Sequence, residues 1–256
     1  MEDFREKKRR GERITSLTAY DYPTARLLDE AGIDIILVGD SLGMVVLGYQ
    51  DTTEVTLEAM IHHTRIVARA VKRALLVADL PIHTYDTPEE ALANAQTLVD
   101  AGAQAVKLEG GVNRVCQIEA IVQAGIPLMA HIGMLPQSVR EEGGYHLKGR
   151  TEAEAEILLR DGRAVEASGA FSVVLEIVAA ETARQITEAL EIPTIGIGSG
   201  ESCDGQILVT HDLIGLFPWF TPKFARPEAD VAGEIRKAAK AFIERTQAPR
   251  HLSAEV

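Results

Sequence analysis

LLVADLP, residues 75–81, is an apolar run that holds one carboxylate, Asp79, two positions before a proline. A short aliphatic run that ends at a proline predicts a buried β-strand. An ionised carboxylate in such a strand costs free energy unless a cation or hydrogen-bond donors meet it. Asp79 therefore needs a partner, and its neighbours along the chain indicate what kind.

Seven further apolar runs of this type alternate with segments of helical period. With the strand around Asp79 taken as 74–80, the predicted strands are 14–20, 34–40, 74–80, 105–110, 127–133, 171–177, 193–199 and 205–211. Two of the helical segments follow Thr87 and Thr151, which are favourable N-cap residues. Eight strands alternating with helices in 256 residues predict a (β/α)8 TIM barrel that forms a single domain over residues 1–256.

Three features depart from a regular barrel. Only five residues separate the seventh predicted strand from the eighth, so we expect at most one helical turn there. Long insertions, residues 43–55 and 134–151, follow the second and fifth strands, where barrels build sites and lids. We expect the charged segment 1–13 to be a solvated turn and the tail 246–256 to be mobile.

The composition narrows the class of protein. Hydrophobic residues make up 46% and charged residues 25%, as in ordinary globular proteins, and the net charge of −12 argues against nucleic-acid and anionic-membrane partners. No apolar run reaches the roughly 18 residues of a membrane span. Cys116 and Cys203 lie far apart, outside any CxxC spacing, which favours neither a zinc site nor a disulfide. Because neither cysteine is expected to form a disulfide, a reducing cytoplasm is the simplest setting for this protein.

Polar residues recur where the predicted strands end, although buried parallel strands rarely contain them. Because the carboxyl ends of barrel strands meet at one mouth, we expect the side chains there to form a cluster. Each alone has a structural explanation, as a helix cap, a packing residue or an ion pair. Recurrence in five successive strands favours a site. Its members are Asp40, Ser41, Asp79, Lys107, Glu109, His131 and Glu176.

Four carboxylates at one mouth would repel one another unless a cation lies among them. Oxygen ligands suit a hard metal, so we predict Mg²⁺, which leaves positions for a chelating α-keto acid. The metal would lower the cost of forming an enolate beside the keto carbon, and Lys107 would offset the remaining charge. Glu176, in the apolar run VVLEIV, is the best candidate for the base, since desolvation should raise its pKa.

Several longer motifs carry a family resemblance. They are TAYDYPTA, VGDSLGMVVLGYQDT, ADLP, VKLEGG, AHIGMLPQSV, GGYHLKGR, VLEIV and IGIGSG followed by CDGQILVTHDLIG. In this order and spacing, from about Ile14 to Phe224, the sequence closely resembles the ketopantoate hydroxymethyltransferase family. The resemblance implies a barrel enzyme that transfers a one-carbon unit from 5,10-methylenetetrahydrofolate to 3-methyl-2-oxobutanoate, giving 2-dehydropantoate on the route to pantothenate and coenzyme A.

The resemblance also implies roles for individual residues. It makes Asp40, Asp79 and Glu109 the Mg²⁺ ligands and Glu176 the base that removes the C3 proton. The keto acid would contact Asp40, Ser41, Asp79 and Lys107, with His131 as a further residue of the pocket. A cytoplasmic homo-oligomer, commonly a decamer, is the expected assembly. Two positions depart from the family pattern, since Leu135 replaces an expected Thr and Ser199 an expected Ala.

Other interpretations remain open. A Mg²⁺-dependent keto-acid lyase or mutase of the phosphoenolpyruvate mutase and isocitrate lyase type places carboxylates similarly, although the KKCGH-like loop of such lyases is missing here. A barrel that only binds or assembles should have lost some of the mouth residues, and this sequence keeps them all. GIGSG, residues 196–200, could bind phosphate, but close backbone packing at the barrel mouth is the better explanation.

Overall fold

The computed structural model describes residues 1–248, and in it the predicted barrel is confirmed. Eight parallel strands pair in chain order, and β8 pairs with β1 to close the ring. Each strand is shorter than its predicted run, mostly because the last residues turn into the following loop. The strands are β1 (Ile14–Thr18), β2 (Ile35–Val38), β3 (Leu75–Asp79), β4 (Ala105–Glu109), β5 (Leu128–Gly133), β6 (Ser172–Glu176), β7 (Thr194–Ile197) and β8 (Gly205–Leu208).

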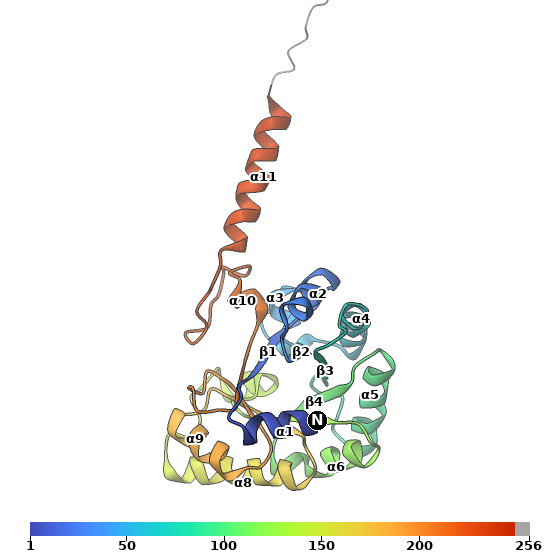
Figure 1. Cartoon of the computed structure of the whole chain (residues 1–256), viewed down its shortest axis with the longest axis vertical. Coiled ribbons are helices and arrows are strands. Elements are labelled where there is room, and N and C mark those ends of the chain that lie inside the picture. The colour runs from blue at the N-terminus through green and yellow to red at the C-terminus, as the bar shows by residue number, and fades with distance from the viewer. Residues whose placement is uncertain (249–256) are drawn as a thin grey trace, which may run out of the picture. The chain divides into compact units, whose positions relative to one another are not determined.

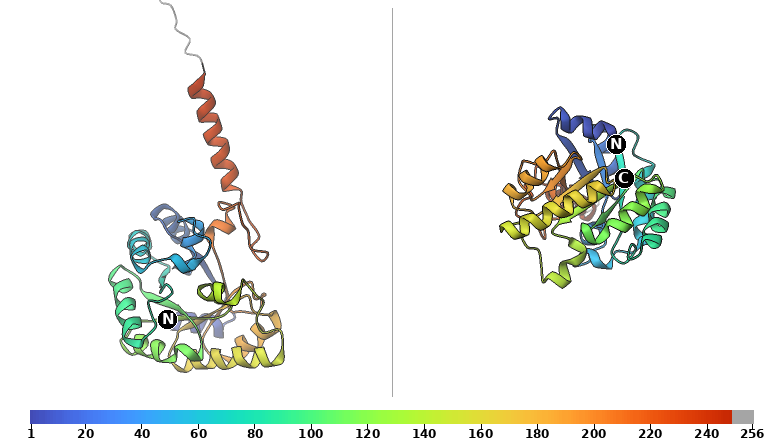
Figure 2. Two further views of the ribbon diagram at one scale, coloured as in Figure 1. Left: turned by 180° about the vertical axis from the view of Figure 1, so that it is seen from behind. Right: turned by 90° about the horizontal axis from the view of Figure 1, so that it is seen from below.

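Six longer helices connect the first seven strands. They are α2 (Tyr22–Ala31), α4 (Leu57–Ala68), α5 (Pro88–Asp100), α6 (Val115–Gln123), α8 (Glu152–Ala167) and α9 (Ala180–Ala189). Thr87 caps α5 and Thr151 caps α8 through their side chains, as predicted. Figure 1 and the left view of Figure 2 both show α8 and α9 side by side along one edge of the barrel. In the described chain, no helix separates β7 from β8, which agrees with the five-residue spacing.

The two insertions contain only short helical turns. The first holds α3 (Leu42–Val45) and the 3-10 turn η1 (Thr52–Glu54), and the second holds η3 (Pro136–Ser138) and α7 (Val139–Glu142). A further 3-10 turn, η2 (Val112–Arg114), precedes α6. Arg140 joins the insertions because its guanidinium contacts Asp51 at 2.7 Å and Glu54 at 2.9 Å. The two predicted insertions therefore meet above the carboxyl ends of the strands.

Buried apolar side chains form two layers. One layer lies between the strands and the helices, and the other fills the inside of the barrel. Alternate residues along each strand point to opposite faces, so Leu37, Val77, Ala105, Met129 and Val174 all belong to the inner layer. This parity decides which polar residues enter the barrel.

The N-terminal segment forms a helix, α1 (Glu2–Arg9), instead of the predicted solvated turn. Phe4 lies 6.2 Å, ring to ring, from Phe171, at the amino-terminal end of the barrel. Lys7 pairs with Asp34, and Lys8 Nζ lies 2.9 Å from Asp204 Oδ2. Apolar packing and ion pairs thus hold α1 against that end, which the composition of the segment alone did not indicate.

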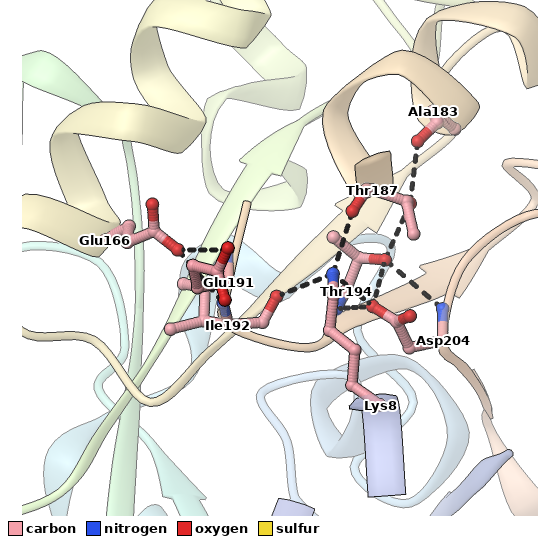
Figure 3. Close-up of polar contacts among 8 residues, drawn as sticks. All are labelled: Lys8, Glu166, Ala183, Thr187, Glu191, Ile192, Thr194 and Asp204. Atoms are coloured by element: carbon pink, nitrogen blue, oxygen red, sulfur yellow. Dashed lines mark hydrogen bonds and ion pairs between the residues drawn. The ribbon is translucent and has the colours of Figure 1, made fainter. Parts of the chain in front are cut away.

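Figure 3 shows the surroundings of Lys8. Its ammonium also donates to the backbone carbonyls of Thr187 (2.8 Å) and Ile192 (3.2 Å), and Asp204 accepts from the amide of Thr194 at 2.8 Å. The nearby Glu166 accepts from two backbone amides, those of residues 191 and 192. Lys8, Asp204 and Glu166 therefore each have more than one partner.

The chain divides into two compact units, Met1–Val209 and the part from Thr210 onward. The second unit contains α10 (Thr210–Leu213) and α11 (Val231–Gln247). The predicted mobile tail 246–256 begins inside α11, and its residues 249–256 lie outside the described residues. The single domain over residues 1–256 stays a prediction.

Cys116 and Cys203 are both free thiols, the first exposed and the second buried. None of the helices in residues 1–248 has the length and apolar character that crossing a membrane requires.

Candidate active site

Strand parity places five of the predicted residues inside the mouth of the barrel. Asp79 shares its strand face with Val77, and Lys107 and Glu109 share theirs with Ala105. By the same alternation, His131 and Glu176 follow inner-layer residues of β5 and β6. Register pairs Asp79 with Lys107 and Glu109 with His131 on neighbouring strands. The predicted cluster therefore exists at the carboxyl ends of β3 to β6.

These five side chains form a continuous row of alternating charge. Lys107 Nζ lies 2.5 Å from Asp79 Oδ2 and 4.0 Å from Glu109 Oε1. His131 lies between two carboxylates, with Nδ1 3.3 Å from Glu109 Oε1 and Nε2 3.3 Å from Glu176 Oε2. The Glu176 side chain is 13% exposed, whereas the other four are at most 5% exposed. The row thus runs from a buried ion pair to a carboxylate that solvent can reach.

Electrostatics keep the two basic groups of this row protonated. Burial lowers the pKa of Lys107, but the charges of Asp79 and Glu109 outweigh burial and raise this pKa above its ordinary value. Burial and Lys107 also lower the pKa of His131, yet the neighbouring carboxylates of Glu109 and Glu176 raise it to about 9. The row therefore carries positive charge at two points between its carboxylates.

Asp40 joins the cluster from the loop after β2. Burial, followed by the negative charges of Asp79 and Glu109, raises its pKa well above the ordinary value. Its Oδ2 accepts a 2.9 Å hydrogen bond from Gln137 Nε2. The hydroxyl of Ser41, the next residue in sequence, forms a 2.8 Å hydrogen bond with the hydroxyl of Tyr20. Asp40 is therefore part of the buried charge cluster, whereas the contacts of Ser41 lead toward β1.

Asp79 and Glu109 each accept a hydrogen bond from the protein through one carboxylate oxygen. Asp79 Oδ2 binds Lys107, and Glu109 Oε2 accepts from the backbone amide of Gln137 at 3.1 Å. Asp79 Oδ1 and Glu109 Oε1 are buried and accept no hydrogen bond from residues 1–248, because the 3.3 Å contact with His131 lacks hydrogen-bond geometry. Buried oxygens of this kind normally have a partner, so they are available to a cation or ligand.

The same oxygens do not already converge on one point. Across the described chain, no three His, Cys, Asp or Glu side chains stand in the arrangement of a metal site. The donor set nevertheless fits a hard divalent cation, since Asp40, Asp79 and Glu109 offer only carboxylate oxygens and are buried together.

The backbone around Glu176 is tightly constrained. A Cβ on Gly133, whose φ is +102°, would lie 2.4 Å from the Glu176 carbonyl oxygen, so only glycine fits there. Ile177 has a φ of +48°, a strained value for a β-branched residue. Ser199 holds this strained segment, because its hydroxyl donates to Leu175 O at 2.7 Å and accepts from Val178 N at 2.9 Å.

The two departures from the family pattern now have structural settings. Ser199 is buried and hydrogen-bonds on both sides of Glu176, which an Ala could not do. Leu135 precedes η3 at its N-cap position, where its side chain makes no capping hydrogen bond. The change to Leu therefore removes the cap that a Thr could provide.

Sequence reasoning missed two buried residues of the site, Gln137 and Tyr85. Gln137 is 4% exposed and contacts Asp40 and Glu109, and the hydroxyl of Tyr85 donates to the Gln137 side chain. Burial, with the charge of Glu109, raises the pKa of Tyr85, so its phenol stays protonated. The only sequence signal was the position of Gln137 inside an insertion at the mouth.

Solved structures similar to this one share its fold. A protein described as a putative phosphonomutase from Burkholderia cenocepacia aligns with a TM-score of 0.67 over 95% of this chain and 96% of its own, at 16% identity. Phosphonopyruvate hydrolase, solved with oxalate and Mg²⁺, also aligns with a TM-score of 0.67, over 100% of this chain and 90% of its own, at 14% identity. At such low identity these matches establish the barrel fold alone.

Sequence relatives are much closer. The 3-methyl-2-oxobutanoate hydroxymethyltransferase of Ignicoccus hospitalis is 53% identical over 95% of this chain and 93% of its own. Its counterpart in Clostridium novyi is 52% identical over 95% of this chain and 90% of its own. The family model of ketopantoate hydroxymethyltransferase matches residues 1–251. This chain therefore belongs to the ketopantoate hydroxymethyltransferase family.

Proposed function

We propose that this enzyme transfers a hydroxymethyl group from 5,10-methylenetetrahydrofolate to 3-methyl-2-oxobutanoate, giving 2-dehydropantoate for pantothenate and coenzyme A synthesis. The close relatives carry the name of this activity. The observation that carries the proposal in this chain is the row of buried charges that ends at the partly exposed carboxylate of Glu176. It supplies a base beside two buried cationic side chains, those of Lys107 and His131, which can stabilise the negative charge that deprotonation next to a keto group creates.

The proposed metal is Mg²⁺, held by Asp40, Asp79 and Glu109. Their buried carboxylates and the two free oxygens, Asp79 Oδ1 and Glu109 Oε1, support this ligand set. A bound Mg²⁺ would polarise the keto oxygen as a Lewis acid. The hydrolase with the same fold was solved with Mg²⁺ and oxalate, a small chelating dianion, which is consistent with this choice.

The protein groups then have separate roles. Asp40, Ser41, Asp79, Lys107 and His131 would surround the keto acid, and the Lys107 ammonium would offset the charge of its carboxylate. Glu176 would take the proton from C3, and the electron pair of that bond moves toward the keto oxygen. Water would release the methylene carbon as formaldehyde, and the two hydrogens of that water go to the two folate nitrogens as their bonds to the carbon break, which leaves tetrahydrofolate. C3 would then bond to the formaldehyde carbon as its C=O π bond opens, and the new alkoxide takes up the proton that Glu176 removed. His131, protonated and 3.3 Å from Glu176, would orient the base.

The direct test is product formation. Purified protein with Mg²⁺, 3-methyl-2-oxobutanoate and methylenetetrahydrofolate should yield ketopantoate, and chelation of the metal should stop the reaction. A parallel assay with a 2-methylisocitrate-type substrate tests the lyase alternative, which the shared barrel leaves open. Cleavage of that substrate without ketopantoate formation would refute the proposed transfer.

The metal ligands have their own test. Asp79→Ala should abolish metal-dependent binding of the keto acid in calorimetry, because it removes a ligand oxygen and the partner of Lys107. Retained binding would count against Asp79 as a ligand.

We also propose a cytoplasmic homo-oligomer. A biosynthetic enzyme that acts on small-molecule substrates fits that compartment, and the decamer rests on the family resemblance alone. Light scattering coupled to size-exclusion chromatography measures the subunit number, and a monomer at micromolar concentration would refute this expectation.

A further inference from the structure

Gln137 uses every hydrogen-bonding group that it points into the site. Its Nε2 donates to Asp40 Oδ2 at 2.9 Å and to the carbonyl oxygen of Leu80 at 3.0 Å. Its Oε1 accepts from the hydroxyl of Tyr85, and its backbone amide donates to Glu109 Oε2 at 3.1 Å. One residue of the loop after β5 thus connects groups from the ends of β2, β3 and β4.

The neighbours of Gln137 fix the orientation of its amide. The Leu80 carbonyl can only accept a hydrogen bond, so Nε2, the donor of the side-chain amide, has to face it, and Asp40 Oδ2 lies within hydrogen-bond distance of the same Nε2. Oε1 then faces Tyr85, which donates. A glutamate could not make both donations, and a methionine of similar length could make none. The arrangement therefore requires an amide at this position.

Tyr85 is itself held in place. The guanidinium of Arg114 lies 4.8 Å from the centre of its ring, and Arg114 Nη1 donates to the Tyr85 carbonyl at 3.4 Å. Gln117 supports the same loop from α6, because its Nε2 donates to the carbonyl of Asp86 at 3.0 Å. Gln117 is also buried, but its hydrogen bond leads to none of the carboxylates.

We propose that Gln137, oriented by Tyr85, is a positioning residue for the metal site: it fixes one oxygen of Asp40 and one of Glu109, which leaves the second oxygen of each for a divalent cation. This inference rests on the proposed metal site. It deepens that proposal because it assigns the geometry of two ligands to a residue that neither binds the ion nor contacts the reacting atoms. Partners of this kind typically change metal affinity about 10–100-fold when they are removed.

The test measures Mn²⁺ binding without substrates, by electron paramagnetic resonance, together with the melting temperature of the metal-free protein. Gln137→Met should weaken Mn²⁺ binding about 10–100-fold. Tyr85→Phe, which removes a single hydroxyl, should weaken it less. Gln117→Met is the matched control, since it removes a buried glutamine beside the same loop. It should lower the melting temperature and leave the Mn²⁺ affinity unchanged.

The outcomes separate the two proposals. Wild-type affinity in both Gln137→Met and Tyr85→Phe would overturn the positioning role while the metal site stands. An equal loss of affinity in Gln117→Met would show a general structural effect, which also overturns it. Wild-type protein that binds no Mn²⁺ would overturn the metal site, and the positioning role with it. If Gln137→Met does not fold, Tyr85→Phe against Gln117→Met decides the question.

Discussion

The two ends of the barrel differ in how fully their carboxylates are hydrogen-bonded. At the amino-terminal end, Asp204 accepts from Lys8 and from Thr194, and Asp34 accepts from Lys7 and Thr15. At the carboxyl-terminal end, a larger set of carboxylates is more deeply buried, yet two of its oxygens accept no hydrogen bond from the described residues.

The difference separates stability from function within one fold. Ion pairs with several hydrogen bonds stabilise the amino-terminal end. At the carboxyl-terminal end, two carboxylate oxygens keep a hydrogen-bonding capacity that a ligand can use. Substitutions at the amino-terminal end should therefore change the free energy of unfolding. Substitutions at the carboxyl-terminal end should change ligand binding and the reaction rate. The following predictions test that division, from the largest effect to the smallest.

Glu176→Gln should have the largest effect. The amide cannot accept the C3 proton, so exchange of that hydrogen of 3-methyl-2-oxobutanoate with D₂O should slow by about 10²–10⁴-fold, as for loss of a general base. Proton NMR of the substrate measures this exchange. Mg²⁺ binding and the melting temperature should stay at wild-type values, and unchanged exchange would remove Glu176 from the mechanism.

Asp204→Ala tests the opposite end. It leaves the buried amide of Thr194 and the ammonium of Lys8 without their shared acceptor, so the free energy of unfolding should fall by about 2–4 kcal/mol. Urea denaturation measures the loss, and kcat of the folded enzyme should not change. Asp204→Asn, which keeps an acceptor, should lose less. A fall in kcat at wild-type stability would contradict the division between the two ends.

Ser199→Ala should combine a small structural effect with a small catalytic one. Without the hydroxyl, the amide of Val178 loses its acceptor, and unfolding should become easier by about 1–2 kcal/mol. Because Ser199 also bonds Leu175, on the other side of Glu176, C3 exchange should slow as well. Thermal melting and the exchange assay measure the two effects. An unchanged melting temperature would show that the strained Ile177 segment does not need this clamp.

Asp34→Asn should have the smallest effect, and the effect should depend on pH. Burial raises the pKa of Asp34, but the hydrogen bonds from Lys7 and Thr15 outweigh burial and lower it below the unfolded value of about 3.9. The stability from this carboxylate is therefore present above that value and is lost as the pH falls through the lower folded pKa. For such a partly exposed pair we expect at most about 1 kcal/mol near neutral pH.

Urea titrations of wild type and Asp34→Asn, from neutral pH down to about pH 3, measure this dependence. The difference between the two proteins should shrink as the acid is added. A difference that stays constant over the whole range would show that the charge of Asp34 contributes nothing.

The repeating pattern of the sequence predicted most of this fold. Eight short aliphatic runs are enough to predict a parallel barrel, and parity along each strand then predicts that Asp79, Lys107 and Glu109 enter its mouth. Their mutual contacts in the structure agree with that reasoning. These features depend on local periodicity, which a sequence displays directly.

The sequence did not reveal features that depend on loop conformation. Gln137 and Tyr85 lie in loops without periodicity, and their contact joins residues 52 positions apart. The helix α1 was missed for a similar reason, since only the folded barrel brings Asp34 and Asp204 to its lysines. The roles of Ser41 and of the Mg²⁺ ligands stay predictions.

The order of folding should follow from the seam where β8 meets β1. The short connection brings β8 to β7 early, whereas pairing β1 with β8 joins residues about 190 positions apart and has to wait for the strands between them. Two lysines of helix α1 form ion pairs with Asp34 and Asp204. Asp34 directly precedes β2 in sequence and Asp204 directly precedes β8, and these two strands are the neighbours of β1 in the barrel. We therefore expect the backbone amides between β1 and β8 to be the first of the barrel to exchange with deuterium. The ion pairs of α1 should slow the local opening that this exchange requires.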